Sequence, residues 1–292
     1  MVLLSLSACE KVSLEELLGN DGKENAGGGN NDTSGDASIT INVGGVESLA
    51  YSGQETAQSD VPLDDVCTRV TVALYQNGER VFYKNQKSTD SGFGTVKLNV
   101  PNGEYSLLVL GYSNKDAATS TNLLKIAFSG KVTDTFRYYE NISLASGNNN
   151  NLDILLKRIV GMFRLVIKDK IPENVKQLKF YYTGGSSTLD GQSGYGCVNS
   201  RQTEYRNVTG TETSFDVYTF PHEESKPMKF TVTALDTSGN TICEKIFENV
   251  IVTTNYITVY TGDFFNASET SKEVTANIRV DNSWTGSTDN RY

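Results

Sequence analysis

From residue 38 onward, apolar residues mostly alternate with polar ones, and few of them recur at the spacing of a helix. Alternation with a period of two places one face of a strand against a core and the other toward solvent. The first such segment is Ser38–Val43. Its apolar residues Ile39, Ile41 and Val43 share one face. The pattern therefore predicts an all-β protein whose first strand starts near residue 38.

Turn sequences indicate how the next strands are connected. Asn77-Gly78 lies between two alternating runs. Asn-Gly in that setting favours a type I′ turn, which joins two antiparallel strands tightly. Pro101-Asn102-Gly103 is placed in the same way and predicts a second hairpin, between strands at 95–100 and 104–110.

The remaining alternating runs extend this pattern to the end of the chain. They predict strands at Leu124–Phe128, Tyr139–Leu144, Asn151–Lys157, Ile159–Ile167, Gln177–Tyr182, Ser214–Phe220, Lys229–Leu235, Thr241–Val252, Asn255–Tyr260 and Glu273–Val280. About seven strands in each half, separated by frequent turns, are typical of two tandem β-sandwiches. We place the first sandwich at 38–157 and the second at 158–292, with the boundary near Lys157-Arg158.

The segment before the first strand has a different composition. From Gly19 to Ala37 it is dominated by Gly, Asn, Asp and Ser. Such a segment buries too little apolar surface to offset the entropy of ordering it. We therefore expect residues 9–37 to be a flexible tether, with an average span of about 30 Å.

The start of the chain suggests a lipid anchor. Cys9 follows Leu6-Ser7-Ala8, and an apolar run, 2–6, precedes it. Small residues before a cysteine at the end of an apolar run match the cleavage site of bacterial lipoprotein signal peptides. Residues 1–8 are then a partial signal peptide, and Cys9 carries diacylglycerol and further acyl chains, which together hold a protein stably on a membrane. The alternative is an unmodified Cys9 in a disordered tail.

Composition narrows the chemistry. The net charge is −9 and Lys and Arg are scattered, which disfavours nucleic acid as a partner. No apolar run after Cys9 approaches the roughly 20 residues that span a bilayer. His222 is the only histidine, and no metal-ligand spacing or nucleophile motif accompanies it. We expect no enzyme activity, no metal, and no cofactor beyond the lipid on Cys9.

Three cysteines remain besides Cys9: Cys67, Cys197 and Cys243. An odd number permits at most one intramolecular disulfide. Cys197 with Cys243 is the favoured pair because both lie in the second half, and buried free thiols are the alternative.

Two segments carry a resemblance to a known family. Residues 100–112 are similar to a closing hairpin of fimbrillin sandwiches, and residues 155–167, followed by Ile171-Pro172, are similar to the crossing between their domains. With the lipid site and spacer, the chain resembles the fimbrillin superfamily of Bacteroidetes-type bacteria, above all its FimB-like fimbrium anchor and accessory lipoproteins. The resemblance implies transthyretin-like sandwiches on the outer membrane and other fimbrial subunits as partners.

The resemblance also implies a mechanism of assembly. Shaft subunits lose their first strand after cleavage by an Arg-directed protease, and a terminal strand of the next subunit fills the groove. Here no Arg occurs before Arg69. The strand bearing Ile39, Ile41 and Val43 is therefore expected to be retained, as in an anchor.

The remaining expectations concern the C-terminal end and the ligand. In Glu273–Val280, alternate residues make a candidate donor strand, consisting of Val274, Ala276, Ile278 and Val280. Its alternative is an ordinary edge strand of the second sandwich. We expect an anchoring or accessory subunit that supports adhesion, with host or bacterial surface molecules as further candidate ligands. Alternatives are a carbohydrate-binding surface lipoprotein, with Trp284 as a candidate contact, or a shaft or tip subunit.

Overall fold

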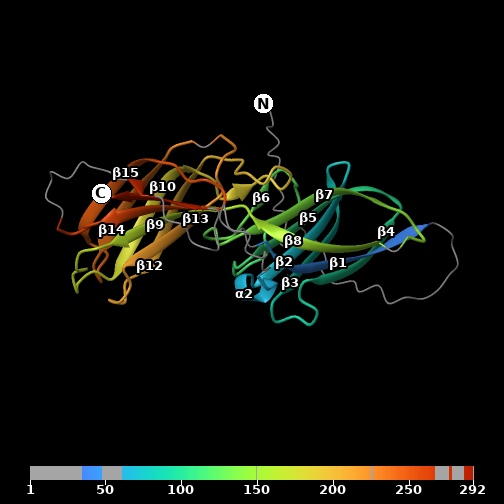
Figure 1. Cartoon of the computed structure of the whole chain (residues 1–292), viewed down its shortest axis with the longest axis horizontal. Helices are drawn as coiled ribbons and strands as arrows, with labels where there is room; N and C mark the ends of the chain where they lie inside the picture. Colours follow the sequence, from blue (N-terminus) through green and yellow to red (C-terminus); the bar gives the residue numbers. More distant parts are fainter. Residues whose placement is uncertain are drawn as a thin grey trace, which may run out of the picture. The chain divides into compact units, whose positions relative to one another are not determined.

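The computed structural model describes residues 35–47, 61–148, 150–224, 226–266, 276–277 and 286–291. Strands dominate these residues, and the helix among them is a single turn, α2 (Leu63–Val66). The expected all-β class is confirmed. Figure 1 shows the strands as arrows, coloured along the chain.

The first half of the chain forms one sheet that folds over on itself. Its strands are β1 (Asp36–Val46), β2 (Arg69–Gln76), β3 (Glu79–Lys87), β4 (Thr95–Pro101), β5 (Gly103–Tyr112), β7 (Phe136–Leu144) and β8 (Asn150–Arg158). They lie in the order β3-β2-β5-β7-β8-β1-β4. β7 and β8 pair only through Phe136 with Arg158 and Arg137 with Lys157. Side chains of β1, β4 and β8 pack against those of β2, β5 and β7 in one core, so the sheet has two layers.

The second half forms two sheets around a core rich in aromatic residues. Its strands are β9 (Gly161–Ile167), β10 (Gln177–Gly185), β12 (Ser200–Asn207), β13 (Ser214–Thr219), β14 (Met228–Leu235), β15 (Thr241–Val250), β16 (Tyr256–Gly262), β17 (Ala276–Asn277) and β18 (Gly286–Arg291). The sheets have the orders β12-β10-β14-β15 and β13-β9-β16-β18-β17. Between them the rings of Phe163 and Phe230 stack with centroids 4.1 Å apart.

The two halves share one topology. β1 pairs antiparallel with β4 and parallel with β8, as β9 does with β13 and β16. The layer β3-β2-β5-β7 corresponds, strand for strand and in chain order, to β12-β10-β14-β15. The second half adds β18, which pairs in parallel with β16, and β17 beyond it.

Each half also carries one long insertion, and the insertions pair with each other. β6 (Ile126–Ala127) lies between β5 and β7, and β11 (Thr188–Leu189) lies between β10 and β12. They form an antiparallel ladder of two residue pairs. Arg137 of β7 reaches the same region and donates hydrogen bonds to the carbonyls of Gly191, at 2.7 Å, and Gln192.

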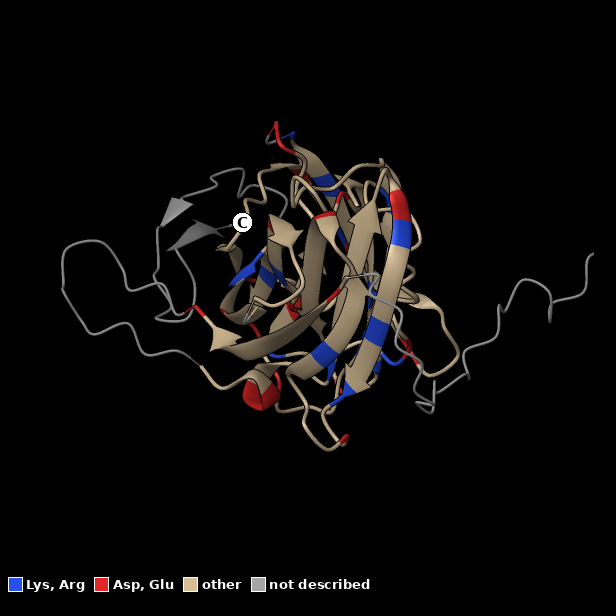
Figure 2. Ribbon diagram, turned by 90° about the vertical axis from the view of Figure 1, so that its right-hand side faces the viewer, with Lys and Arg blue, Asp and Glu red and all other residues tan. Residues whose placement is uncertain are grey.

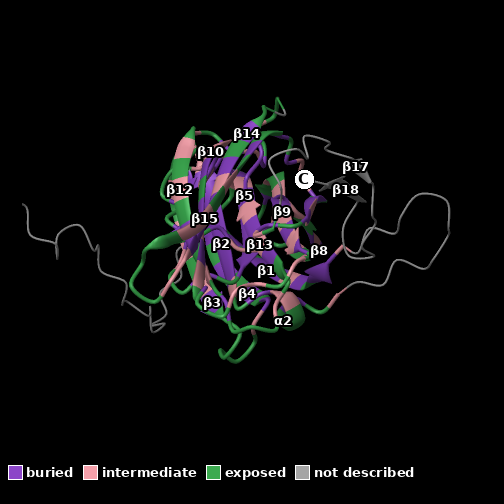
Figure 3. Cartoon of the chain, turned by 90° about the vertical axis from the view of Figure 1, so that its left-hand side faces the viewer, coloured by how far each residue is buried: buried purple, intermediate pink, exposed green. Residues whose placement is uncertain are grey.

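A third core joins the halves. It consists of the outward faces of β2, β5, β9 and β16, both insertions, and the residues that precede β9 and follow β13. Its members include Ala73, Tyr75, Leu108, Leu110, Tyr112, Ile126, Phe128, Val160, Met162, Leu189, Phe220, Ile257 and Val259. β2 and β5 are therefore buried on both faces, and Figure 3 shows β2 with buried positions along its length. Burial on both faces explains why Leu107–Leu110 is a continuous apolar run.

The first predicted hairpin is confirmed. β2 and β3 pair antiparallel across Asn77 and Gly78, whose φ angles are 53° and 84°. Both residue types tolerate this left-handed region, which a type I′ turn requires.

The second predicted hairpin is wrong. β4 pairs with β1, whereas β5 pairs with β2 and β7, so the chain crosses from one layer to the other at Pro101-Asn102-Gly103. Pro101 has no N–H to give to a ladder, which suits the last residue of an edge strand. The amide of Asn102 donates to the carbonyl of Gly35, and this bond holds the crossing against the start of the first strand.

The predicted division at residues 157 and 158 stays a prediction. β8 ends at Arg158 and β9 begins at Gly161, so two residues separate the strands of the two halves. The contacts of the chain nevertheless group Gly35–Tyr292 into one compact unit. The third core accounts for this coherence.

The third core predicts how two neighbouring leucines differ. Leu107 points into the first core and Leu108 into the third, and both side chains are fully buried. We expect either change to alanine to lower the free energy of unfolding by about 2–5 kcal/mol. Only Leu108→Ala should also increase hydrogen exchange in β9 and β16 under native conditions. Val81→Ala, at an exposed site, is the control, and equal exchange profiles for the two leucine variants would contradict the assignment.

Candidate functional site

The first strand lies in the interior of its layer. β1 has seven residue pairs with β4 and seven with β8, so its backbone is paired on both sides. Ala37, Ile39, Ile41 and Val43 are buried in the first core, and the residues between them are exposed or half-buried. The alternation of buried and exposed residues predicted for this strand is thus present in the structure. Each of the larger side chains adds about 1.5–3 kcal/mol by burial, so β1 is an integral part of the fold.

The two ends of the loop after β1 lie next to each other. Val46 and Val61 exchange two backbone hydrogen bonds, of 3.0 and 3.2 Å. Arg69, the first arginine of the chain, lies beyond this point in β2. Its guanidinium donates to the carbonyls of Asn114 and Lys115 and to Asn85 Oδ1, so it is held by the folded body. A protease that cuts after arginine must bind that residue in an extended segment of chain. Arg69 does not offer this, because its side chain is hydrogen-bonded and its strand is paired on both sides.

Asp169 fixes the start of the C-terminal segment. This residue follows β9, and its carboxylate accepts hydrogen bonds from the amides of Phe264, Phe265 and Asn266, at 2.7–2.8 Å. Burial would raise the pKa of this carboxyl, but the backbone amides outweigh it and hold the pKa below its ordinary value of 3.8. The residues directly after β16 are therefore fixed against the residue that closely follows β9.

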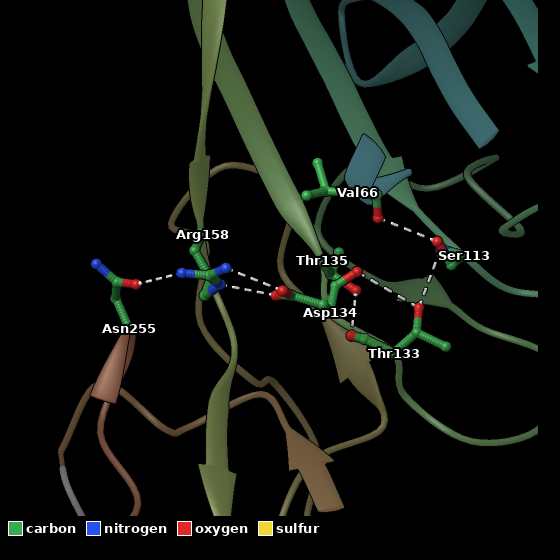
Figure 4. A network of polar contacts seen from close by, with 7 residues as sticks. All are labelled: Val66, Ser113, Thr133, Asp134, Thr135, Arg158 and Asn255. Atoms are coloured by element: carbon green, nitrogen blue, oxygen red, sulfur yellow. Dashed lines mark hydrogen bonds and ion pairs between the residues drawn. The ribbon is translucent and has the colours of Figure 1, made fainter. Parts of the chain in front are cut away.

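A polar network lies where one half passes into the other (Figure 4). The guanidinium of Arg158 donates to both carboxylate oxygens of Asp134, at 2.8 and 3.0 Å, and to Asn255 Oδ1 at 3.1 Å. It also lies over the ring of Phe136, 4.9 Å from the centroid. The Arg158 side chain is 10% exposed. Because Asp134 belongs to the first half and Asn255 to the second, this one side chain ties the two together.

A second polar cluster lies within the second half, where Arg206 pairs with Glu204 and Arg164 pairs with Asp216, both at 2.7 Å. On the face in Figure 2, acidic and basic residues are scattered over the strands and loops. Among the residues that the structure describes, no three His, Cys, Asp or Glu side chains converge as metal ligands. His222 is half-buried, and its Nε2 has no hydrogen-bond partner.

A comparison with models of protein families identifies relatives of this chain. The sequence matches the model of the fimbrillin-A associated anchor proteins Mfa1 and Mfa2 over residues 32–289. This chain belongs to that family. The expected resemblance to fimbrium anchors is thereby confirmed. A search of curated proteins gives no significant match.

Solved structures with a similar fold are distant in sequence. The fimbrial anchor protein Mfa2 from Porphyromonas gingivalis is 11% identical, with a TM-score of 0.42 over 74% of this chain and 83% of that chain. A candidate cell adhesion protein from Bacteroides eggerthii is 12% identical, with a TM-score of 0.48 over 90% of this chain and 99% of that chain.

Several predicted site residues lie outside the described part of the chain. Cys9 and most of the tether precede residue 35, and Trp284 falls in the later gap. Of the candidate donor residues, Ala276 is in β17, where it pairs with Asn290, whereas Val274, Ile278 and Val280 are not described. Within the described residues, no helix is long and apolar enough to cross a bilayer.

The possible disulfide between Cys197 and Cys243 does not form. Both are free thiols, and so is Cys67. Cys197 Sγ donates to the carbonyl of Thr188 in β11, whereas Cys243 Sγ donates to the carbonyl of Phe264. The two cysteines therefore have partners on different elements. Burial raises the pKa of the Cys67 thiol to about 12, which keeps it protonated.

The network at Arg158 can be tested against its neighbour in sequence. Arg158→Met leaves the partly buried carboxylate of Asp134 without its ion-pair partner. We therefore expect the free energy of unfolding to fall by about 3 kcal/mol. Lys157→Met, which removes an ion pair of an exposed lysine with Glu47, should change it by less than about 0.5 kcal/mol. Urea unfolding of both variants measures this. Equal effects would refute the role of Arg158.

Asp169 predicts a dependence on pH. Its pKa is lowered in the folded state, so its stabilisation is complete above the unfolded pKa of about 3.9 and is lost as pH falls through the lower folded value. Asp169→Asn should therefore cost about 1–2 kcal/mol at pH 7. The difference between wild type and variant should shrink below pH of about 4. A difference that stays constant down to acid pH would contradict this account.

Proposed function

We propose that this protein is a lipid-anchored, non-enzymatic subunit that holds a fimbrium on the outer membrane. Its membership of an anchor family gives the general role. The observation that carries the finer proposal is the position of β1, which is paired on both sides and buried on its inner face. A subunit that keeps this strand also keeps whatever precedes it in the chain.

The segment before β1 supplies the attachment. Cys9 would carry the acyl chains, and the polar residues up to 37 would give reach between the lipid and the sandwiches. No arginine precedes Arg69, and Arg69 itself is bonded within the fold. Both facts favour a chain that is not cut between its lipid and its body, so the lipid stays covalently joined to β1.

The C-terminal end supplies the contact with the first shaft subunit. β17 is the last strand of its sheet, and only β18 separates it from β16. As the last strand of the sheet, this segment has only β18 to separate from when it leaves. The alternation Val274, Ala276, Ile278 and Val280 gives it the pattern of a strand that fills a groove in a partner.

The carbohydrate-binding alternative has one observation in its favour. Tyr181 and Tyr205 lie on the outer face of β10 and β12 and are 37% and 50% exposed. In the β10–β12 register Tyr205 is opposite Lys179, so the two rings are diagonal neighbours. Two exposed aromatic rings on neighbouring strands can stack on sugars.

Truncation separates these proposals. A chain that ends before Lys272 should fold, because the described members of both sandwich cores precede residue 272. It should nevertheless fail to retain fimbriae on cells. Cys9→Ser should instead release the whole protein together with its fimbriae. Intact mass of protein extracted from its native membrane reports the acyl chains on Cys9 and any cut of the first strand.

Normal retention of fimbriae by the truncated chain would overturn the anchoring role of the C-terminal segment. Glycan binding that is lost in Tyr205→Ala, with retention unchanged, would favour the carbohydrate-binding alternative. Mass consistent with a chain that starts after residue 46 would show that β1 is removed.

A further inference from the structure

A pocket lies at the end of the second half that is farther from the first half. β9 starts at the junction, two residues after β8, and runs to Ile167, so the segments beyond its end lie at the far end of the second sandwich. Residues from 168–176, after β9, and from 208–213, between β12 and β13, line a cavity of about 820 Å³ there. Pockets that hold small ligands have volumes of about 300–1,000 Å³. The cavity is therefore large enough for a small organic ligand.

The floor of this pocket is apolar. Val175 and Val208 belong to the second core and are buried, and Ile171 packs against that core and is half-buried. A ligand that covers such a floor removes apolar surface from water, which adds to its affinity. The floor therefore favours a ligand with one apolar face, which inorganic phosphate does not have.

The rim of the pocket carries three exposed lysines, Lys168, Lys170 and Lys176. An ammonium group has three N–H donors. Lys176 gives one of them to the carbonyl of Glu173, at 2.8 Å, and Lys170 lies 3.7 Å from the Glu173 carboxylate in a pair whose side chains are 83% and 92% exposed. Within the described residues no ion pair engages Lys168. Most of the lysine donors are therefore available to a ligand.

Two of the three acidic residues of the lining are already occupied. The carboxylate of Asp169 accepts the amides of residues 264–266. The carboxylate of Glu212 accepts from the amide and the hydroxyl of Thr209, at 2.6–3.1 Å. The lining thus has as many carboxylates as lysines, but its free hydrogen-bonding groups are mainly donors. Such a pocket matches a ligand rich in acceptors, above all an anion, because charge-assisted hydrogen bonds are the stronger ones.

The backbone of the lining is also paired. The amide of Ile167 donates to the carbonyl of Thr213 at 2.8 Å, and the amide of Val208 donates to the carbonyl of Lys176 at 2.9 Å. An extended peptide that adds to a sheet binds mainly through free backbone groups. Recognition in this pocket rests on side chains instead, which suits a compact ligand better than a peptide.

We propose that this pocket binds an acidic saccharide through the carboxylate of a sugar acid. A pyranose ring has an apolar C–H face that can cover the floor at Val175 and Val208, and hydroxyls at its edge that can reach the rim. Its carboxylate accepts hydrogen bonds from Lys168 and the neighbouring lysines. The exposed hydroxyl of Thr213 lines the same pocket and is a further donor.

This pocket is separate from the surfaces that the other proposals use. Anchoring of a fimbrium uses the two ends of the chain, and the carbohydrate-binding alternative uses Tyr181 and Tyr205, neither of which lines the pocket. An acidic sugar bound here would give an anchoring subunit an additional contact, with a surface polysaccharide. Retention of fimbriae does not require this contact, so the two proposals can fail separately.

The first test measures the binding of defined trisaccharides to the full chain by isothermal titration calorimetry. Trisaccharides of galacturonic, glucuronic and mannuronic acid are compared with the neutral trisaccharides of galactose, glucose and mannose. We expect saturable binding of at least one acidic trisaccharide, and its neutral counterpart should bind roughly tenfold more weakly. Inorganic phosphate should compete poorly, because it has no apolar face for the floor.

Charge variants of two lysines test the location of the site. Lys168→Gln removes an ammonium group from the rim and should weaken binding of the acidic trisaccharide roughly tenfold. Lys84→Gln, at an exposed position of β3 in the first half, is the matched control and should leave binding unchanged. The bound trisaccharide should also slow the acetylation of Lys168, measured by mass spectrometry, but not that of Lys84.

A second pair of variants does not depend on the loss of a native contact. The side chain of Thr213 is exposed, so its replacement leaves the core closed. Thr213→Glu should weaken binding of the acidic trisaccharide, whereas Thr213→Lys should strengthen it. Urea unfolding should give similar midpoints for both variants. Opposite effects at one position follow from charge and not from a change of fold.

Each contrary result would overturn the proposal. Absence of binding by all three acidic trisaccharides at millimolar concentration, or equal binding of the neutral trisaccharides, would exclude an acidic sugar as the ligand. Equal effects of Lys168→Gln and Lys84→Gln, or a change in the same direction in both Thr213 variants, would exclude the pocket as its site. Competition by phosphate as strong as that by the acidic trisaccharide would show an unspecific anion site.

Discussion

The structure depends on two neighbouring strands, β2 and β5, that are buried on both of their faces. β2 and β5 send alternate side chains into the first core and into the third, so they have no solvent face over most of their length. Removing apolar surface from water on both sides is the largest favourable term available to a strand. Burial on the second face also restricts how the second sandwich can be placed, because that sandwich must present a complementary apolar face. Two sandwiches of the same topology are thereby held as one body.

The polar contacts at the junction serve orientation more than adhesion. A bidentate pair such as Arg158 with Asp134 contributes little net free energy once its desolvation is counted, but it tolerates only one geometry. The ladder between β6 and β11 adds a second fixed point. An apolar interface alone would permit sliding. These directional contacts select one arrangement from those that the third core allows.

The sequence predicted the strands well and their partners less well. Alternation identified Ile39, Ile41 and Val43, and Asn77-Gly78 identified the first hairpin, because both signals are local. At Pro101-Asn102-Gly103 a similar local signal marks a crossing between layers, and only the pairing of β4 with β1 reveals it. The prediction of a disulfide was wrong for the same reason, because two cysteines in the same half of the chain need not lie next to each other in the fold.

The junction was the least predictable part. Arg158 looks like any charged residue at a strand end, and its partners Asp134 and Asn255 are far from it in sequence. The apolar run at Leu107–Leu110 did carry a signal of burial on both faces, but not of what covers the second face. Family membership named the protein's relatives, whereas the register of the strands shows which of its edges are open.

The double pairing of β1 has a mechanical meaning. A pull along this strand, applied to the chain before residue 35, loads seven residue pairs on each side at the same moment. Hydrogen bonds sheared together resist a force far better than bonds opened one after another. A strand that was paired on one side only could separate from its neighbour one residue pair at a time. The first strand can therefore pass a pulling force from the chain before residue 35 to the first sandwich without its pairs opening one by one.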